Sequence, residues 1–320
     1  MKRREFITLV VGAAAAWPLA ARAQQPTMPV VGILDSAVNA VPSFRKGLYQ
    51  PGYLEGRNVT IELRSSEEYS DLPALAAELV HRRAAVIAAL GGPAAPAAKA
   101  ATTTIPIVFS IGGDPVELGL VSSLSRPGGN ITGVTFLSAE LLQKQVGMLH
   151  DLVPNAAVIG ALVNPNNPRH RADLSSVQAA AGTLGLDLHV ARAGSEDELD
   201  SAFAGLARSN ARALIIAGDA LFWHVIDKLA ALAQQHRIAA IFTARKFAQV
   251  GGLVTYGASV TDSFRQTGIY VGRILKGEKP GGLPVIQPTK FELVINLKAA
   301  RVLGLDVPPY LQQLADEVIE

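Results

Sequence analysis

The chain has 320 residues, of which 49% are hydrophobic and 18% are charged, and its formal net charge is +2. It contains no cysteine, which excludes disulfides, thiolate metal sites and cysteine nucleophiles and leaves the fold to be held by its hydrophobic core. The length is sufficient for two lobes of ordinary domain size.

The first 23 residues have the pattern of a secretory signal peptide. Basic residues 2–4 precede an apolar run at 7–16, and Ala21-Arg22-Ala23 then supplies the small-x-small pattern that signal peptidase recognises. The apolar run is far shorter than the roughly 20 residues that span a bilayer. We therefore expect export to the periplasm, with cleavage near Ala23. Arg3 and Arg4 resemble a twin-arginine signal, but Sec signals also begin with arginines, so both export routes stay open.

Loss of this segment changes the charge of the chain. It removes four basic residues and one acidic residue, so the formal charge of +2 becomes −1. The rest of the sequence has no Lys/Arg stripe with interleaved aromatic residues, and no second apolar run of membrane-spanning length. We therefore expect neither a nucleic-acid partner nor membrane insertion of the mature chain.

From residue 30 onward, short apolar runs rich in β-branched residues alternate with helical stretches. This alternation predicts an α/β fold with parallel sheets covered by helices on both faces. The runs are too many for one doubly wound sheet and divide in half near residues 138–153, so we expect two doubly wound parallel-sheet lobes with a ligand cleft between them. The predicted strands are residues 30–34, 59–63, 85–90, 105–109 and 131–136 in the first half, and 158–163, 186–191, 213–217, 239–242 and 253–256 in the second.

In sheets of this kind, ligands bind beyond the carboxyl ends of the strands. Gly91 and Gly92, followed by Pro93 at the start of a helix, would present backbone N–H groups to a carboxylate or another anion. A simple tight turn is the equal alternative. The predicted strand ends, rich in glycine and small polar residues, are residues 35–36, 91–93 and 110–114 in the first half, and 164–167, 218–219, 243–245 and 257–259 in the second.

Two aspartates lie at these strand ends. Asp219 follows an apolar strand and begins a helix predicted to run to residue 235, so it suits the N-cap position. It also suits a ligand ammonium or hydroxyl in the cleft, and the two roles are compatible. Asp114 precedes Pro115 after two glycines; Asp-Pro favours a turn by itself, so a turn competes with a ligand role there.

The sequence contains no evident catalytic constellation. The six histidines mostly lie within helical stretches beside charged residues, where solvent exposure is expected. Neither a metal-binding histidine pattern nor a G-x-S-x-G nucleophile motif occurs. We therefore expect no catalytic residue, no metal and no cofactor. An enzyme on the same fold stays an alternative, because a fold alone does not decide activity.

Longer stretches carry a resemblance that covers nearly all of the chain after the signal peptide. They are GYLEGRNVTIELR (52–64), LPALAAELV (72–80), AAKAATTTIPIVF (97–109), GGDPVELGLVSSLSRPGGNITGVTFLS (112–138), LVNPNNP (162–168), GGLVTYG (251–257), YVGRILKGEKPGGLPVIQPTKFELVINLKAARVLGL (270–305) and ADEVIE (315–320). The sequence resembles the ABC-transporter substrate-binding proteins of the ABC_sub_bind family, most specifically in RPGGN (126–130) and QPTKF (287–291).

The resemblance implies a type I periplasmic-binding fold, in which two α/β lobes joined by crossover segments clamp a small ligand. Some members of the family bind aromatic amino acids. On this basis we expect an N-terminal lobe of residues 24–137, joined by about 258–288. The C-terminal lobe would comprise residues 138–257, joined by about 289–320.

Three features depart from the family pattern. The loop at residues 37–43 is shorter than in relatives, Pro93 and Pro96 make the next loop rich in proline, and FTARKF at 242–247 replaces an aromatic, acid-rich segment. The last change leaves Thr243 and Arg245, which would favour a more anionic ligand. The residue patterns and the resemblance together give a predicted ligand-binding set of Ser36, Gly91, Gly92, Pro93, Ser110, Asp114, Asn164, Asp219, Thr243 and Tyr256.

The resemblance implies the periplasmic solute-binding component of an ABC importer. Such a protein closes on one small ligand, here an amino acid, an aromatic acid or another small carboxylate, and presents it to an inner-membrane permease. Two alternatives stay open: an exported enzyme on the same fold, and a sensory subunit that passes the closed state to a membrane receptor.

Overall fold

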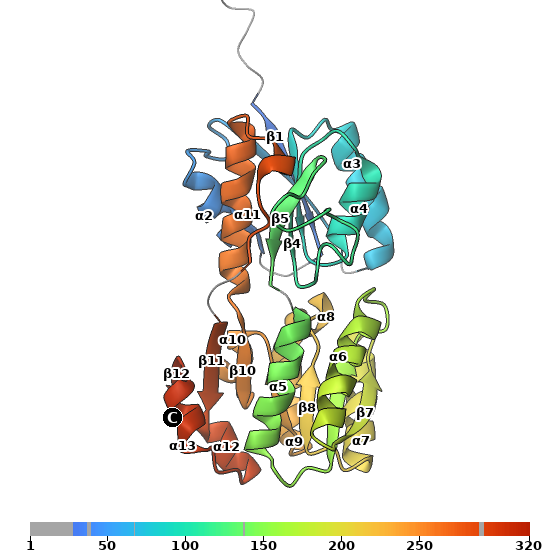
Figure 1. Ribbon diagram of the computed structural model, residues 1–320, viewed down its shortest axis with the longest axis vertical. Coiled ribbons are helices and arrows are strands. Elements are labelled where there is room, and N and C mark those ends of the chain that lie inside the picture. The colour runs from blue at the N-terminus through green and yellow to red at the C-terminus, as the bar shows by residue number, and fades with distance from the viewer. Residues whose placement is uncertain (1–27, 37–39, 67, 137, 288–290) are drawn as a thin grey trace, which may run out of the picture.

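The computed structural model describes residues 28–36, 40–66, 68–136, 138–287 and 291–320. The predicted signal peptide lies outside these residues. The described chain forms two α/β lobes stacked along the long axis of the molecule (Figure 1). Each lobe has one sheet flanked by helices, so the prediction of two doubly wound lobes is confirmed.

The N-terminal lobe contains a five-stranded sheet in which all neighbouring strands are parallel. The strand order β2-β1-β3-β4-β5 reverses between β1 and β3, and doubly wound sheets bind ligands at such a switch point. The strands are β1 (Val30–Asp35), β2 (Thr60–Ser65), β3 (Val86–Leu90), β4 (Ile107–Ile111) and β5 (Ile131–Thr135). The helices are α2 (Ala40–Tyr49), η1 (Tyr69–Asp71), α3 (Leu72–His81), α4 (Ala94–Ala101), α11 (Val260–Leu275) and η3 (Pro280–Gly282).

The C-terminal lobe contains a seven-stranded sheet with the order β12-β11-β10-β9-β8-β6-β7. Neighbours from β7 to β10 are parallel, and the order reverses between β6 and β8 as it does in the first lobe. The strands are β6 (Val158–Val163), β7 (Asp187–Arg192), β8 (Ala213–Ile216), β9 (Ala239–Phe242), β10 (Val254–Ala258), β11 (Phe291–Asn296) and β12 (Glu317–Ile319). The helices are α5 (Ser138–Leu152), α6 (His170–Thr183), η2 (Glu196–Glu198), α7 (Leu199–Arg208), α8 (Ala220–His224), α9 (Ile226–Gln235), α10 (Arg245–Gln249), α12 (Leu297–Leu303) and α13 (Pro309–Leu314).

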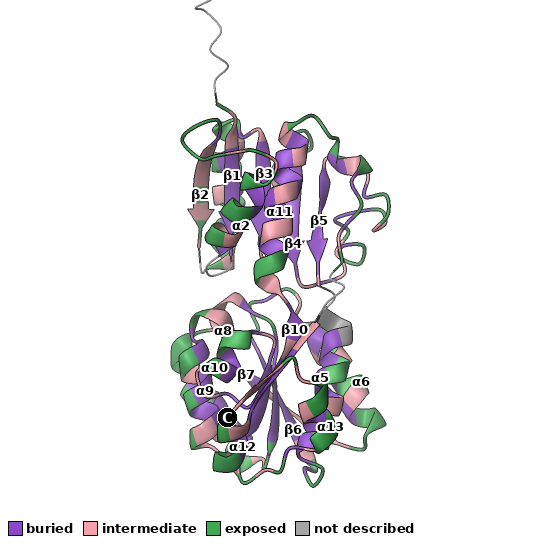
Figure 2. Cartoon of the chain, turned by 90° about the vertical axis from the view of Figure 1, so that its left-hand side faces the viewer, coloured by how far each residue is buried: buried purple, intermediate pink, exposed green. Residues whose placement is uncertain are grey.

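The central strands are buried on both faces, which explains their nearly continuous apolar sequences. Every residue of β3, β4 and β5 is buried, and so is every residue of β8 and β9. Each lobe has two hydrophobic clusters that involve its sheet. Figure 2 shows the buried residues concentrated in the sheets, with exposed residues on the outer helices.

The chain passes between the lobes after β5, between β10 and α11, and before β11. Helix α11 therefore returns to the N-terminal lobe, where it packs beside α2 (Figure 1). The two helices approach closely: a Cβ on Gly268 would lie 2.2 Å from the carbonyl oxygen of Phe44. The predicted lobe boundaries fall near these passages and stay a prediction.

Three features differ from the predicted elements. Strands β11 and β12 were not predicted, and β11 pairs antiparallel with β10, so the second sheet is mixed. β11 leads directly into α12, whose N-cap is Asn296, and β12 has only three residues, which is too short for a periodic pattern. The helix expected after Asp219 is broken at Val225, where α8 ends and α9 begins.

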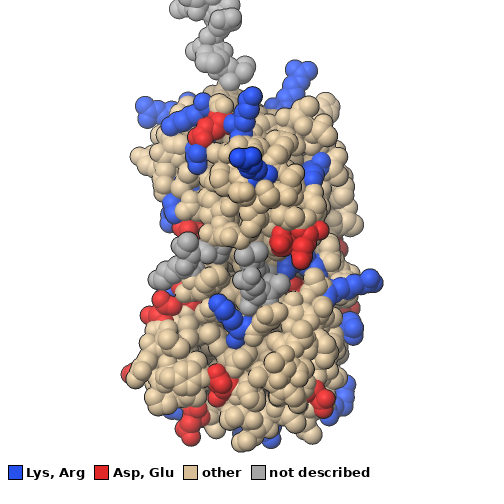
Figure 3. Space-filling view, in the orientation of Figure 1, with Lys and Arg blue, Asp and Glu red and all other residues tan. Residues whose placement is uncertain are grey.

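Basic and acidic side chains are interspersed over both lobes on the face shown in Figure 3. Some form exposed ion pairs, for example Lys246 with Asp227 at 2.6 Å and Arg273 with Glu278 at 2.6 Å. Such pairs contribute only about 0–1 kcal/mol each, so the free energy of unfolding comes mainly from the buried core. Among the described helices, none is long and apolar enough to cross a membrane.

Candidate ligand-binding site

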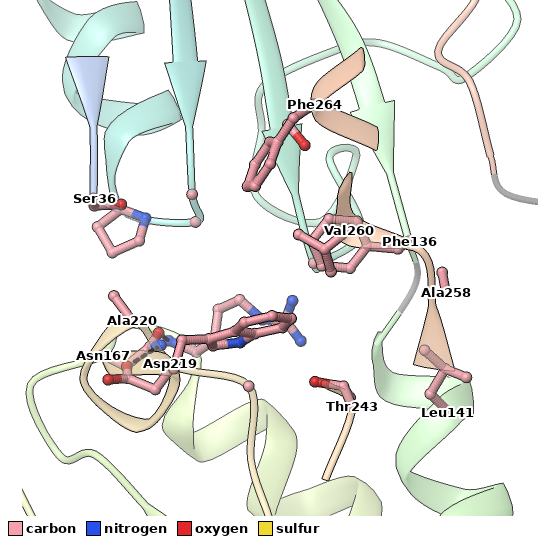
Figure 4. A pocket seen from close by; sticks show the side chains of 18 of the residues that line it. Ser36, Phe136, Leu141, Asn167, Asp219, Ala220, Thr243, Ala258, Val260 and Phe264 are labelled. Atoms are coloured by element: carbon pink, nitrogen blue, oxygen red, sulfur yellow. Dashed lines mark hydrogen bonds between the residues drawn. The ribbon is translucent and has the colours of Figure 1, made fainter. Parts of the chain in front are cut away.

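A cavity of about 110 Å³ lies between the lobes, where the carboxyl ends of the strands in both sheets face each other. The two switch points both contribute to it. Ser36 and Gly91 follow β1 and β3 in one lobe, and Asn167 and Asp219 follow β6 and β8 in the other. Figure 4 shows Ser36 across the cavity from Asp219 and Asn167. The matching topologies of the lobes thus place two sets of polar groups around one space.

The loop after β3 has a shape that requires glycine. Gly91 has a φ of +101°, and a Cβ there would lie 2.3 Å from Ser36 Oγ. The backbone N–H of Gly91 donates to the carbonyl of Ser110 at 2.9 Å, while Ser36 Oγ donates to the carbonyl of Leu90 at 3.3 Å. The turn then leads through Pro93 into α4, whose positive end is directed at this part of the cavity wall.

Ser110 is a residue of the cavity wall whose hydroxyl is buried without a hydrogen-bond partner among the described residues. The residue lies in β4 and is fully buried. A buried polar atom without a partner costs about 1–3 kcal/mol, so a ligand oxygen that bonds to Ser110 would recover this free energy.

Asp219 is buried, and its carboxylate accepts four hydrogen bonds. Oδ1 accepts from Asn164 Nδ2 at 3.0 Å and from the backbone N–H of Leu221 at 3.0 Å. Oδ2 accepts from Asn167 Nδ2 at 2.7 Å and from the hydroxyl of Tyr69 at 2.8 Å. The bond to Leu221 confirms the predicted N-cap, here on the short helix α8.

The bond between Tyr69 and Asp219 joins the two lobes, because η1 belongs to the first lobe and Asp219 to the second. Burial, the charge of Asp219 and the hydrogen bond to Asp219 together raise the pKa of the Tyr69 phenol well above its usual range. The phenol therefore keeps its proton at neutral pH and acts as the donor in this bond.

Arg169 is a cation in the cavity wall. Its guanidinium donates to Asp173 at 2.7 Å, and both side chains are largely buried. Burial raises the pKa of Asp173, while the positive charge of Arg169 opposes this shift. The guanidinium also reaches the other lobe, since a Cβ on Gly113 would lie 2.5 Å from Arg169 Nη1. Arg169 is thus a second contact between the lobes.

The remaining wall of the cavity is apolar and largely aromatic. Trp223 projects from α8 and packs against Phe242, with ring centroids 5.6 Å apart. Phe264 and Val260 come from α11, and Phe136 comes from the segment that follows β5 (Figure 4). A flat apolar body would fill this space, with polar groups directed at the strand ends.

Seven of the ten predicted binding residues line this cavity, namely Ser36, Gly91, Gly92, Pro93, Ser110, Asp219 and Thr243. Asn164 lies behind Asp219, on a larger polar groove along the same interface. Asp114 Oδ1 accepts from the N–H of Val116 at 2.7 Å, as its turn interpretation predicts. Tyr256 stacks on Phe291 instead, and neither it nor Asp114 is among the residues that line the cavity.

Arg245, which the sequence suggested as a cause of anion preference, forms ion pairs with Glu317 and Glu292 and does not line the cavity.

The residues that sequence analysis missed come from helices and connecting segments. Arg169 and Trp223 follow predicted strand ends within two to four residues, so a search of the first turn after each end would have found them. Phe136 ends the predicted strand 131–136, so the end of that strand marks it as well, whereas no local signal marks Phe264 or Tyr69.

A ligand cavity between two similar α/β lobes, lined from the facing strand ends, defines a two-lobed binding protein of the type I periplasmic-binding class. Among the described residues, no group of histidine, aspartate and glutamate side chains is arranged to hold a metal ion.

The chain belongs to the family of ABC transporter substrate binding proteins, whose model matches residues 29–319. It is 26% identical to a tyrosine-binding protein of Clostridioides difficile over 83% of this chain and 76% of the relative. A conserved domain protein from Vibrio cholerae has a similar structure, with a TM-score of 0.83, 27% identity, and coverage of 91% and 100%. An ABC domain from Streptococcus pneumoniae in complex with L-Trp has a TM-score of 0.81, 26% identity, and coverage of 92% and 100%. The family and the tyrosine-binding relative are binding proteins rather than enzymes.

Proposed function

We propose that this protein is the periplasmic solute-binding component of an ABC importer, and that it clamps one small aromatic carboxylate between its lobes. The observation that carries the proposal is the cavity at the facing strand ends, which combines aromatic walls with the unsatisfied hydroxyl of Ser110. The tyrosine-binding relative and the L-Trp complex support an aromatic ligand.

Within this proposal, the ligand carboxylate lies against the N-terminal lobe. Ser110 donates its hydroxyl, and the turn at 91–93 directs the positive end of α4 at the anion. The ring of the ligand lies among Trp223, Phe136 and Phe264, which come from different segments of the chain. Contacts to both lobes supply the free energy that favours the closed form.

A titration monitored by tryptophan fluorescence tests the proposal. The sequence has two tryptophans, Trp17 in the predicted signal peptide and Trp223 in the cavity wall, so the mature protein reports on the site alone. A thermal-shift screen of amino acids, aromatic acids and small carboxylates identifies the ligand first, because a ligand at 100 times its dissociation constant adds about 2.7 kcal/mol to the free energy of unfolding. Saturable quenching of Trp223 with the ligand recovered unchanged supports a binder; a product in the same mixture supports the exported enzyme.

The periplasmic location is inferred from the signal-peptide pattern in the sequence, and the permease partner is inferred from the family. Intact-mass measurement of the secreted protein tests the periplasmic location. We expect the mature chain to begin at Gln24. A chain that keeps residues 1–23 and is found in the membrane fraction would contradict this location. Replacing Arg3 and Arg4 by lysine blocks export only if the twin-arginine route is used. Ligand-dependent stimulation of a permease's ATPase activity would separate an importer component from a sensory subunit.

A further inference from the structure

The four hydrogen bonds to Asp219 decide what else this carboxylate can bind. A carboxylate offers about four lone-pair positions to donors. Asn164, Asn167, Tyr69 and the backbone of Leu221 already occupy four positions on Asp219. A ligand ammonium, which needs acceptors for three protons, would have to displace one of these donors.

The two asparagine donors are fixed in orientation by the backbone. Asn164 Oδ1 accepts from the N–H of Asn166 at 2.9 Å, and Asn167 Oδ1 accepts from the N–H of Arg169 at 2.9 Å. Turning either amide would place its –NH₂ group against a backbone N–H. Both side chains must therefore present Nδ2 to Asp219. The N–H of Leu221 is fixed by α8, which leaves the Tyr69 hydroxyl as the one donor that a rotation can remove.

The described cavity wall holds no second carboxylate, and Asp35 and Glu68 lie on the adjoining groove instead. Asp219 is the only carboxylate among the described residues that line the cavity. The nearby Asp173 is paired with Arg169 and lies outside the cavity wall. An ammonium moved from water into this space would lose its hydration without gaining a free anionic partner, which is strongly unfavourable.

We propose that the cavity takes an aromatic acid without an ammonium group, and that the Tyr69 hydroxyl sets this preference by occupying Asp219. The inference rests on the proposed function and narrows its ligand class. It separates this protein from the tyrosine-binding relative and from the domain solved with L-Trp, since both of those ligands carry an ammonium group.

Calorimetric titration of the mature protein with a matched pair of ligands tests the preference. The pair is 3-phenylpropanoate and L-phenylalanine, which differ only in the ammonium group. We expect the acid to bind about tenfold more tightly or better, because the amino acid must displace a buried donor. Equal or tighter binding of L-phenylalanine would overturn the inference and leave the proposed function standing, whereas binding of neither ligand would overturn both.

Tyr69→Phe tests the role assigned to the hydroxyl. The variant frees one position on Asp219 Oδ2, so the ratio of the two affinities should shift toward L-phenylalanine by about tenfold. Tyr270→Phe is the matched control, because Tyr270 donates to the carbonyl of Pro284 at the same distance of 2.8 Å but does not line the cavity. Circular dichroism checks that both variants fold. An unchanged ratio in folded Tyr69→Phe would refute the role of Tyr69, and a ratio that shifts in both variants would do the same.

Discussion

Gly91 lies in a left-handed backbone conformation, with a φ of +101° and Ser36 Oγ in the position a side chain would need. We expect Gly91→Ala to lower the free energy of unfolding by about 2 kcal/mol and to weaken ligand binding. Gly92→Ala is the control, because Gly92 has no such φ and no atom lies within 4 Å of a Cβ placed there. Urea denaturation of both variants measures the difference. Equal stability would show that the turn does not require glycine at position 91.

Asp219 stabilises the fold through its four donors, beyond its role as a cap. A cap alone would tolerate Asp219→Asn at little cost. The amide instead places an –NH₂ group against two buried donors, so we expect the free energy of unfolding to fall by about 2–4 kcal/mol. Asp114→Asn is the control: Asp114 caps an exposed turn, and an asparagine oxygen can accept the same bond. Urea denaturation measures the free energy of unfolding of both variants. A small and equal loss in the two would show that Asp219 stabilises the fold only as a helix cap.

The candidate site could be predicted at the strand ends and not on the helices. Ser36, Gly91 and Asp219 were found because small polar residues that follow apolar strands mark the binding edge of a parallel sheet. Phe264 was missed because its helix follows the strands of one lobe in sequence but packs in the other. The bond from Tyr69 to Asp219 links residues 150 positions apart, so no local pattern contains it.

At the scale of elements, the contact between α2 and α11 holds the returning helix to the N-terminal lobe. A Cβ on Gly268 would lie 2.2 Å from Phe44 O and 2.7 Å from Leu48 N, and backbone atoms cannot yield as a side chain can. We expect Gly268→Ala to lower the free energy of unfolding by about 2–3 kcal/mol. A Cβ on Gly147 in α5 would have no atom within 4 Å, so Gly147→Ala should raise the free energy of unfolding by about 0.5–1 kcal/mol. Thermal denaturation distinguishes the two; a tolerated alanine at 268 would mean that the helices can separate.

Ten strands were predicted close to their observed positions, because strands buried on both faces leave an apolar run that needs no tertiary information. β11 was missed although Leu293, Val294 and Ile295 form a buried apolar run of the same kind. What its sequence does not contain is its antiparallel pairing with β10, which lies more than thirty residues upstream. The antiparallel direction of this pair follows from the passage of the chain through α11 and back.

At the scale of the whole molecule, three passages of the chain connect lobes that otherwise meet across the cavity. The bond from Tyr69 to Asp219 and the approach of Arg169 to Gly113 are contacts that join the two lobes. A ligand that touches both walls adds to these contacts and shifts the population toward the closed form. We therefore propose that the two lobes clamp a ligand between them.

Small-angle X-ray scattering of the mature protein, with and without saturating 3-phenylpropanoate, measures whether the lobes close on the ligand. Calorimetry on the same sample establishes saturation independently of shape. We predict a smaller radius of gyration in the complex, because closure brings the two lobes together around the ligand. A saturated complex with the same radius of gyration as the free protein would contradict the clamp.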